Sequence, residues 1–287
     1  MLAKIISIAV PLAIVLPIVY GFIRKIPLSL MLILSNFIVF FITFPFLKLA
    51  INEFAFNPLY LSSLTKIYTI FTSMFLHGGF DHILFNMIGL FFIGLPFENE
   101  VGTKKFITIY FISGISAALL FSFYNFGETY LIGASGAIFG ILGAFAACCP
   151  FKRVFVPVPM FIMFFMRIPV IVLALLYAGL ETFYTLLGAP DGVAHSAHLG
   201  GFIAGVFMYP FIKRKVEART DININDLEEL IVNDKQREIF DKVKQADEAD
   251  VRDAWLSYLL KHVKCPKCGG EISVKEGIKC KKCGYKK

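Results

Sequence analysis

Two polar side chains begin apolar stretches of the chain, where a buried polar group is costly. Ser135 lies in Gly133-Ala134-Ser135-Gly136, which opens an apolar run to Pro150, and His198 stands at the head of a second apolar run. Polar and ionisable residues inside hydrocarbon are rare and are functional candidates by default. A serine and a histidine are also the minimum for an activated oxygen nucleophile, because the imidazole can take the hydroxyl proton. The pair predicts nucleophilic chemistry in an apolar setting.

The composition is that of a polytopic membrane protein. Of the 287 residues, 57% are hydrophobic and only 17% are charged. A soluble protein rarely carries so few charges, because its surface must be solvated. The net charge of +7 comes mostly from short clusters between apolar runs and from a Lys-rich C-terminus. We therefore expect the basic residues to set membrane topology, and we expect no nucleic-acid partner.

Seven apolar runs follow one another before residue 213. A helix needs roughly 20 residues to cross ~30 Å of hydrocarbon, so most of these runs can span a bilayer and two are short. The runs are 5–23, 28–50, 82–97, 105–123, 135–150, 167–187 and 195–212.

The first run, residues 5–23, has the length of a span but could also be read as a signal peptide. It contains two prolines, and Arg24-Lys25 follows it in place of a small-residue cleavage site. These features favour a retained extra helix over a cleaved signal, and the sequence alone leaves both open.

Basic clusters fall on alternate connections between the runs, and the intervening connections hold few basic residues. The positive-inside rule places these clusters and the C-terminal tail in the cytoplasm. The clusters are Arg24-Lys25, Lys104-Lys105, Lys152-Arg153 and Lys213-Arg214-Lys215.

Four polar side chains from three runs are predicted to lie at a similar depth. A helix rises about 1.5 Å per residue, so height follows from the distance to the charged residue at the cytoplasmic end. The heights are about 25 Å for Ser135, about 22 Å for His198, about 24 Å for His82 and about 18 Å for Asn86. This agreement predicts one buried polar site that opens to the outer face.

Small residues recur at every fourth position on two of the predicted helices. Such faces let membrane helices approach closely, so we expect these two helices to meet and to bring Ser135 and His198 together. The motif is common in membrane proteins and does not by itself identify its partner. The small residues are Gly136, Gly140, Ala144 and Cys148 on one run, and Ala197, Gly201 and Gly205 on the other.

Four separated motifs resemble those of the rhomboid family of intramembrane serine proteases and occur in the family's order. They are His77-Gly78-Gly79-Phe80-Asp81-His82-Ile83-Leu84-Phe85-Asn86, Phe97-Glu98 followed by Gly102, Gly133-Ala134-Ser135-Gly136, and Ala194-His195-Ser196-Ala197-His198-Leu199-Gly200-Gly201. The resemblance covers roughly residues 28–213. It implies an all-α polytopic fold, with a six-helix protease core at 28–215 and here an extra transmembrane helix at 1–27. It also implies a Ser-His pair that needs neither a triad acid nor a cofactor.

The resemblance assigns roles to individual residues. Ser135 would be the nucleophile, and His198 would be the general base and later the general acid. His82 and Asn86 would donate hydrogen bonds to the oxyanion together with the backbone N–H of Ser135. A helix N-terminus has free N–H groups of this kind, and acyl transfer needs such donors in its transition state.

Other residues of the motifs are expected to support the site. Gly133 and Gly136 would allow close backbone approach, and Phe139 would pack against the catalytic imidazole at a family position that often holds Tyr. His77 and His195 are expected to be structural. A metal site formed by His77, His82, His195 and His198 is a weaker alternative, because it leaves Ser135 and Asn86 unexplained.

Carboxylates are expected to be absent from the depth of His198. Asp81 and Asp191 are the only exceptions, and both are predicted to be loop residues on the outer face. An acid is one way to orient a base and not the only one, so a dyad suffices.

Three connecting segments have predicted roles beside the site. By resemblance, the loop 49–81 is partly embedded at the outer interface, the helix 167–187 moves aside for substrate, and the loop 188–194, with Pro190, caps the site. Residues 151–168, with Pro157 and Pro159, are expected to lie in the cytoplasmic interface.

The chain becomes soluble in character after residue 215. Residues 216–263 are predicted to form short amphipathic helices, and residues 264–287 to form a zinc ribbon. Cys265, Cys268, Cys280 and Cys283 form two CxxC pairs, each followed by glycine. Four thiolates with this spacing make a closed tetrahedral Zn²⁺ site, here structural, and a redox CxxC is the weaker alternative.

These observations predict an intramembrane serine endopeptidase of the cell membrane. Its substrates would be transmembrane proteins in the lipid bilayer, its tail would be cytoplasmic, and its active site would open outward. A rhomboid-like protein that binds membrane clients without cutting them is the alternative, although such proteins typically lack the Ser-His pair. A channel or transporter would spread ionisable residues through the depth. The natural substrate, the oligomeric state and the role of the ribbon do not follow from the sequence.

Overall fold

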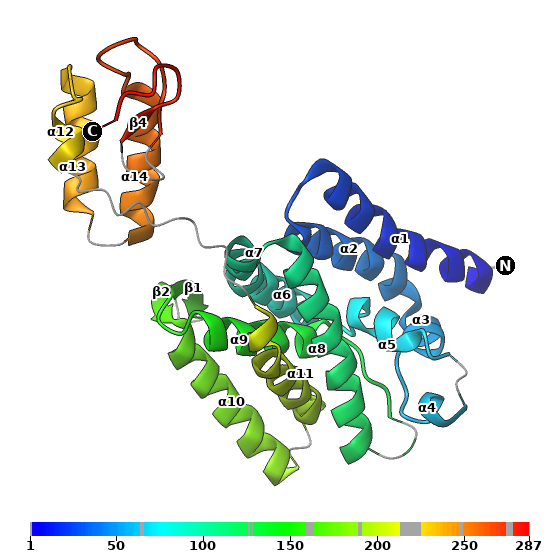
Figure 1. The fold of residues 1–287 in the computed structure, drawn as a ribbon. Coiled ribbons are helices and arrows are strands. Elements are labelled where there is room, and N and C mark those ends of the chain that lie inside the picture. Colours follow the sequence, from blue (N-terminus) through cyan, green and yellow to red (C-terminus); the bar gives the residue numbers. More distant parts are fainter. Residues whose placement is uncertain are drawn as a thin grey trace. The chain divides into compact units, whose positions relative to one another are not determined.

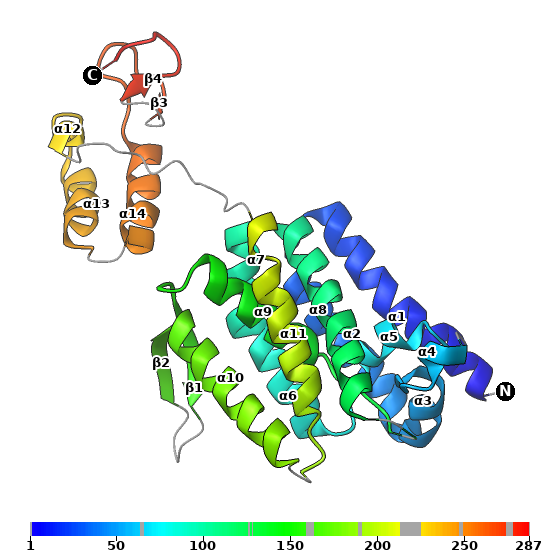
Figure 2. The ribbon, with the colours of Figure 1, turned by 60° about the horizontal axis from the view of Figure 1, so that its bottom comes forward.

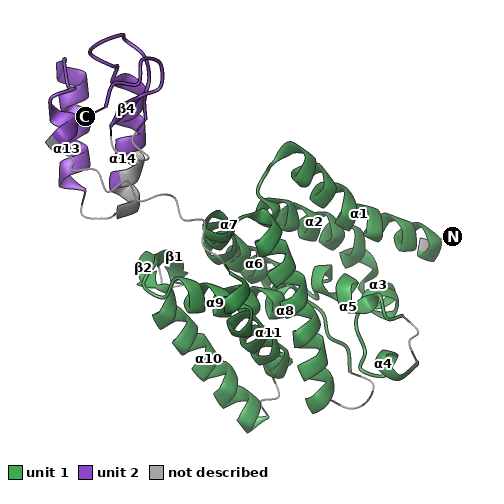
Figure 3. Ribbon diagram, viewed as in Figure 1, with its two compact units in different colours: residues 1–215 green, residues 216–287 purple. Residues whose placement is uncertain are grey.

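A computed structural model describes residues 2–63, 66–125, 127, 129–158, 164–188, 191–212, 225–246, 249–273 and 278–286. The chain forms two compact units, residues 1–215 and 216–287 (Figure 3). Lys213-Arg214-Lys215, Pro159 and Pro190 were singled out in the sequence and lie outside the described residues.

The first unit is built almost entirely from helices (Figure 1). Its α-helices are α1 (Leu2–Arg24), α2 (Leu28–Thr43), α3 (Leu47–Phe54), α4 (Tyr60–Ser63), α5 (Thr69–Thr72), α6 (Phe80–Gly89), α7 (Leu95–Val101), α8 (Thr103–Tyr124), α9 (Ser135–Cys148), α10 (Val170–Leu187) and α11 (His195–Phe207). Short helical turns η1 (Phe44–Phe46), η2 (Ser73–Phe75), η3 (Leu90–Gly94) and η4 (Tyr209–Phe211) link or end them.

Five helical stretches of the described chain are long and apolar enough to cross a membrane. They are Ala3–Arg24, Leu28–Phe54, Phe80–Val101, Thr103–Tyr124 and Val170–Leu187, and α9 is a shorter apolar helix. The prediction of an all-α polytopic membrane fold is confirmed, and helix α1 packs against α2.

Prolines explain two irregular turns within these stretches. Pro45 interrupts the helix between α2 and α3, where η1 is a 3-10 turn. Pro96 follows η3, a π-helical turn between α6 and α7. Proline lacks the N–H that would continue the helical hydrogen bonds, so the backbone changes its pitch beside it.

Helix α9 lies at the centre of the first unit, in contact with α6, α8, α10 and α11 (Figure 2). It spans 14 residues, of which 11 are buried. Glycine, alanine and large apolar residues occur on every side of it, which is the composition of a helix packed all round. The helix that begins at Ser135 is therefore fixed by its neighbours.

Glu98 and Glu100 hold together one end of the first unit. Glu98 is buried and accepts hydrogen bonds of 2.8 Å from the backbone N–H groups of Leu28 and Ser29, at the start of α2. Glu100 pairs with Lys152, just after α9. The basic clusters at 24–25, 104–105 and 152–153 therefore lie at the same end of the unit, as the alternation along the sequence predicted.

A β-hairpin occupies most of the segment that was expected to be an interfacial stretch. Strand β1 (Arg153–Val158) pairs antiparallel with β2 (Phe164–Pro169), and Val154 lies opposite Ile168. β-branched and aromatic residues favour this extended pairing. Helix α10 consequently begins at Val170 and not at residue 167.

The described residues of the second unit form three helices and a two-stranded sheet. The elements are α12 (Asn225–Glu228), α13 (Asp234–Gln245), α14 (Ala249–His262), β3 (Ile272–Ser273) and β4 (Lys279–Cys280). Leu227, Phe240 and Leu259 share one hydrophobic core with Cys265 and Cys280. The described residues on both sides of position 264 thus contribute to a single core.

Candidate active site

Helices α9 and α11 cross at their small residues. A Cβ added to Gly201 would lie 1.8 Å from the carbonyl oxygen of Gly136, and one added to Gly205 would lie 1.8 Å from that of Gly140. Such distances exclude any side chain at the crossing. The predicted contact between the two small-residue faces is confirmed, and it brings the beginnings of both helices together.

The Ser135 hydroxyl and the His198 imidazole form a hydrogen bond at this crossing. Ser135 Oγ lies 2.8 Å from His198 Nε2. Ser135 is the first residue of α9, so backbone N–H groups of the first turn lie beside its hydroxyl. His198 is 8% exposed and stacks on Phe139, with ring centroids 4.4 Å apart and planes 5° apart. The spacing along the sequence predicts a similar depth for these two side chains, and the structure shows them in contact.

His82 lies against the loop that leads into α9. Gly133 has a φ of +115°, and a Cβ there would lie 2.6 Å from His82 Nε2. Only glycine combines this backbone conformation with this approach. The His82 Nδ1 accepts a 3.4 Å hydrogen bond from the backbone N–H of Gly78, and the ring packs edge-on against the fully buried His77.

Asn86 lies one turn below His82 on α6 and is buried. Its Nδ2 donates a 2.8 Å hydrogen bond to the carbonyl oxygen of His82. An amide nitrogen carries two N–H donors, so this bond leaves one for another acceptor.

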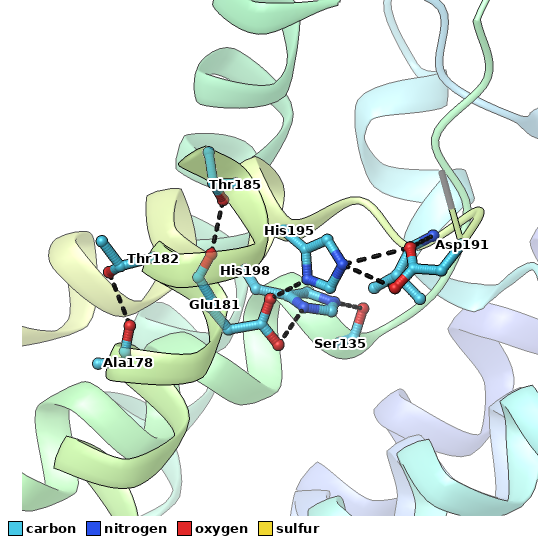
Figure 4. A network of polar contacts seen from close by, with 9 residues as sticks. Ser135, Ala178, Glu181, Thr182, Thr185, Asp191, His195 and His198 are labelled. Atoms are coloured by element: carbon cyan, nitrogen blue, oxygen red, sulfur yellow. Dashed lines mark hydrogen bonds and ion pairs between the residues drawn. The ribbon is translucent and has the colours of Figure 1, made fainter. Parts of the chain in front are cut away.

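Glu181 on α10 is a functional candidate that the sequence reasoning missed. Its Oε1 lies 3.0 Å from His198 Nδ1, within ion-pair distance although not in line for a regular hydrogen bond. Its Oε2 lies 2.5 Å from His195 Nδ1 (Figure 4). The prediction that only Asp81 and Asp191 could provide a carboxylate near His198 was therefore wrong.

A signal for Glu181 was present in the sequence. It is the sole charged residue between positions 170 and 187, in a helix that is otherwise apolar or uncharged. An ionisable residue in such a span is a functional candidate by default. Its partners could not be inferred, since the sequence spacing does not say which face of α10 meets α11.

His195 extends the network to Asp191, in the loop before α11. Its Nε2 lies 3.0 Å from Asp191 Oδ2, and its ring stacks on Tyr184. Asp191 also accepts a 2.9 Å hydrogen bond from the backbone N–H of Val193, which together with His195 lowers the pKa of the Asp191 carboxyl. His195, the first residue of α11, thus contacts the carboxylates of both Glu181 and Asp191.

The alternative metal site of four histidines is not formed in the part of the chain that the structure describes. His195 and His198 gather with Glu181, while the rings of His77 and His82 lie against each other and belong to no such cluster among the described residues. Ser135 is in contact with the His198 imidazole, and the four histidines do not form one metal-ligand cluster among the described residues.

A small pocket lies beside the Ser135 hydroxyl. Its volume is about 10 Å³, on the order of the space that one water molecule needs. Glycine and alanine residues make most of its wall, and Ser73, Met74, Leu131 and Ser135 complete it. A large side chain would not enter it without rearrangement.

The second unit brings its four cysteines to one point. The Sγ atoms of Cys265 and Cys283 are 3.7 Å apart, and those of Cys268 and Cys280 are 3.5 Å apart. Zn–S bonds of about 2.3 Å in a tetrahedron put sulfurs about 3.8 Å apart, so the set fits such an ion. All four Sγ atoms lie within 4.8 Å of one another and could hold a metal.

The two CxxC turns have matching backbones that aim the thiols inward. The N–H of Gly269 donates to the carbonyl of Cys265, and the N–H of Gly284 donates to that of Cys280. Backbone N–H groups, first that of Cys283 and then that of Lys282, together with the neighbouring thiols lower the pKa of the Cys280 thiol to about 6. A thiolate is the form that binds metal.

Comparisons with known proteins agree with the motifs. Residues 64–215, just over half of the chain, match the Rhomboid domain. Similar proteins include RHOMBOID-like protein 1 of Arabidopsis thaliana, 43% identical over 28% of this chain and 20% of its own length. Rhomboid-like protease 3 of Toxoplasma gondii is 31% identical over 53% of this chain and 54% of its own length.

A bacterial relative shows a similar degree of identity. Rhomboid protease GluP of Bacillus subtilis is 30% identical over 48% of this chain and 24% of its own length. The chain thus spans about half or less of the length of each of these three relatives. The domain match, the helical membrane fold and the four motifs in order lead to one conclusion: the chain belongs to the rhomboid family.

Proposed function

We propose that this protein is an intramembrane serine endopeptidase that cleaves the transmembrane segments of other membrane proteins. The single observation that carries the proposal is the 2.8 Å hydrogen bond between Ser135 Oγ and His198 Nε2, inside a unit of membrane-spanning helices. A hydroxyl paired with a buried imidazole is poorly explained as packing, because an apolar pair would avoid the desolvation cost.

The chemistry is acyl transfer in two steps. The Nε2 of His198 takes the proton of Ser135 as its Oγ attacks the scissile carbonyl carbon. The same nitrogen then gives the proton to the leaving amine. In the second step His198 takes a proton from a water molecule, whose oxygen attacks the acyl carbon. His198 then gives that proton to Ser135 Oγ as the bond between Oγ and the acyl carbon breaks, which releases the carboxylic acid and restores the serine hydroxyl.

Negative charge on the carbonyl oxygen would be stabilised from two sides. The backbone N–H of Ser135 approaches from the start of α9, and the His82 ring and the second N–H of Asn86 from α6. Each donor of this type is typically worth about 10²–10³ in rate.

The pocket beside Ser135 supports cleavage next to a small side chain. Its walls of glycine and alanine leave room for little more than a methyl group. A substrate segment would also have to unwind locally, because a helix keeps its carbonyls within its own hydrogen bonds.

The basic clusters at one end of the first unit support an orientation with that end in the cytoplasm. In this orientation Ser135 would face outward, away from Lys152. For the second unit we propose a structural Zn²⁺ held by Cys265, Cys268, Cys280 and Cys283, with no cofactor in the protease step.

A cleavage assay tests the proposal. The purified protein in liposomes is mixed with a model transmembrane substrate, and Ser135→Ala and His198→Ala are measured beside the wild type. We expect both variants to lose cleavage, and a fluorophosphonate probe to label the wild type at Ser135. Undiminished cleavage by folded Ser135→Ala would overturn the proposal and favour a protein that only binds its clients.

A further inference from the structure

Helix α10 is attached to the rest of the first unit very unevenly. Its buried residues are Val170, Leu173 and Ala174 in the first turns, and then Glu181 alone. The large apolar side chains around Glu181, such as Leu180 and Phe183, are exposed. The C-terminal half of the helix therefore meets the core chiefly through one carboxylate and through aromatic contacts.

The Glu181 carboxylate is shared between two histidines of α11. One oxygen lies 3.0 Å from His198 Nδ1 and the other 2.5 Å from His195 Nδ1. Asp191 binds the far nitrogen of His195 and so fixes that ring on its other side (Figure 4). The carboxylate is thus held by His195, whose ring is itself fixed by Asp191. This places it 3.0 Å from the Nδ1 of His198, the imidazole that contacts Ser135.

A carboxylate beside Nδ1 has a definite consequence for the other nitrogen. It favours the tautomer with hydrogen on Nδ1, and this leaves the lone pair of Nε2 facing the serine hydroxyl. It also stabilises the imidazolium that forms when His198 takes the proton. Both effects require the carboxylate to stay within a few ångströms of Nδ1.

We propose that Glu181 is a positioning residue that orients His198, so that the Ser135–His198 pair is fully competent only while α10 is seated against α11. The proposal rests on the proposed protease function. If α10 swings out to admit a substrate, the carboxylate leaves with it, and acylation follows its return. The helix thereby couples entry of the substrate to the readiness of the base.

A small fluorophosphonate probe distinguishes this role from one in which Glu181 only holds α10 against α11. We compare Glu181→Gln with the wild type and with Thr182→Val, whose hydroxyl bonds only within α10 to Ala178 and is exposed. The Gln amide can offer an N–H to Nδ1 and so favour the wrong tautomer. We expect the labelling rate of Ser135 and kcat on a transmembrane substrate to fall about 10–100-fold, with KM changed less than about threefold, and Thr182→Val to match the wild type.

The opposite result would show that Glu181 only holds α10 against α11. Labelling of Glu181→Gln at the wild-type rate or faster, with kcat unchanged or raised, would overturn the positioning role while leaving the protease function intact. Absence of labelling in the wild type would overturn both. If Glu181→Gln does not fold, Glu181→Asp replaces it, because it keeps the charge but withdraws the carboxylate by one methylene. We expect a smaller loss of kcat at constant KM, and a wild-type kcat in that variant would also overturn the proposal.

Discussion

The ring of Phe139 lies flat against the imidazole of His198, with centroids 4.4 Å apart and planes at 5°. The Phe139 ring also makes a T-shaped contact with Tyr177 of α10, with ring centroids 5.8 Å apart. The imidazole is thus confined by an aromatic face, by Ser135 at one nitrogen and by Glu181 at the other. Its rotation about the side-chain bonds would break all three contacts.

Substitutions of Phe139 are predicted to separate the effect of the ring contact from that of the hydroxyl group that a tyrosine would add. Phe139→Tyr keeps the stack, and we expect its kcat to stay within about twofold of the wild type. Phe139→Ala frees the imidazole to turn, and we expect a loss of about 10-fold or more, since small misplacements of a base are costly. The measurement is kcat on a transmembrane substrate for folded protein. A wild-type kcat in Phe139→Ala would refute the role of the stack.

The crossing of α9 and α11 is predicted to tolerate no side chain at Gly201. The methyl group of Gly201→Ala would meet the Gly136 carbonyl oxygen at 1.8 Å, and backbone cannot yield as a flexible side chain does. We expect a loss of at least about 2 kcal/mol in stability. Activity should fall too, because the helices would separate where Ser135 and His198 meet. Thermal unfolding in detergent and the cleavage assay measure both effects.

Gly179→Ala is the matched control for that substitution. Gly179 lies on α10 with nothing within 4 Å of its added Cβ. Alanine is a better helix former than glycine, so we expect unchanged or slightly higher stability. Equal destabilisation by both substitutions would refute the role of the close crossing, because Gly179→Ala creates no close contact.

Glu98 is predicted to be a stability residue. Glu98→Gln replaces one of the two oxygens that accept from Leu28 and Ser29 by an NH₂ group, so one buried N–H loses its partner. We expect a cost of about 1–3 kcal/mol in thermal unfolding. Glu53→Gln is the control, since Glu53 pairs with Lys66 at the surface and such pairs contribute little. Similar losses in both variants would contradict the special role of Glu98.

The positions of the site residues along their helices could be predicted from the sequence. The directions in which their side chains point around the helix axes could not. Counting residues from the charged helix ends gives one coordinate along the membrane normal, which sufficed to group Ser135 with His198. The small-residue faces added the contact of α9 with α11. Glu181 was missed because its partners are on another helix, and the rotation of α10 about its axis is set by packing with α11.

Local backbone changes were also beyond the sequence patterns. The hairpin of β1 and β2 follows from pairing between residues such as Val154 and Ile168, and each strand alone reads as a short apolar segment. The π-helical turn η3 before Pro96 is a response to a missing N–H inside an otherwise regular span. In both cases the pattern of apolar residues identifies an apolar segment. It does not reveal where the backbone hydrogen bonds of that segment change.

Removal of metal is predicted to affect the second unit and to spare the first. Cys268→Ser takes away one of four thiols that fit a tetrahedral ion, so we expect zinc content, measured by elemental analysis, to fall from about one per chain toward zero. Because Cys265 and Cys280 belong to the core that contains Phe240 and Leu259, limited proteolysis should then cut within residues 225–286. Fluorophosphonate labelling of Ser135 should persist, since the first unit has its own core. Cys149→Ala, a buried cysteine of the first unit, should leave zinc content unchanged. A wild-type protein without zinc, or a Cys268→Ser variant that retains it, would refute the assignment of these thiols as the metal ligands.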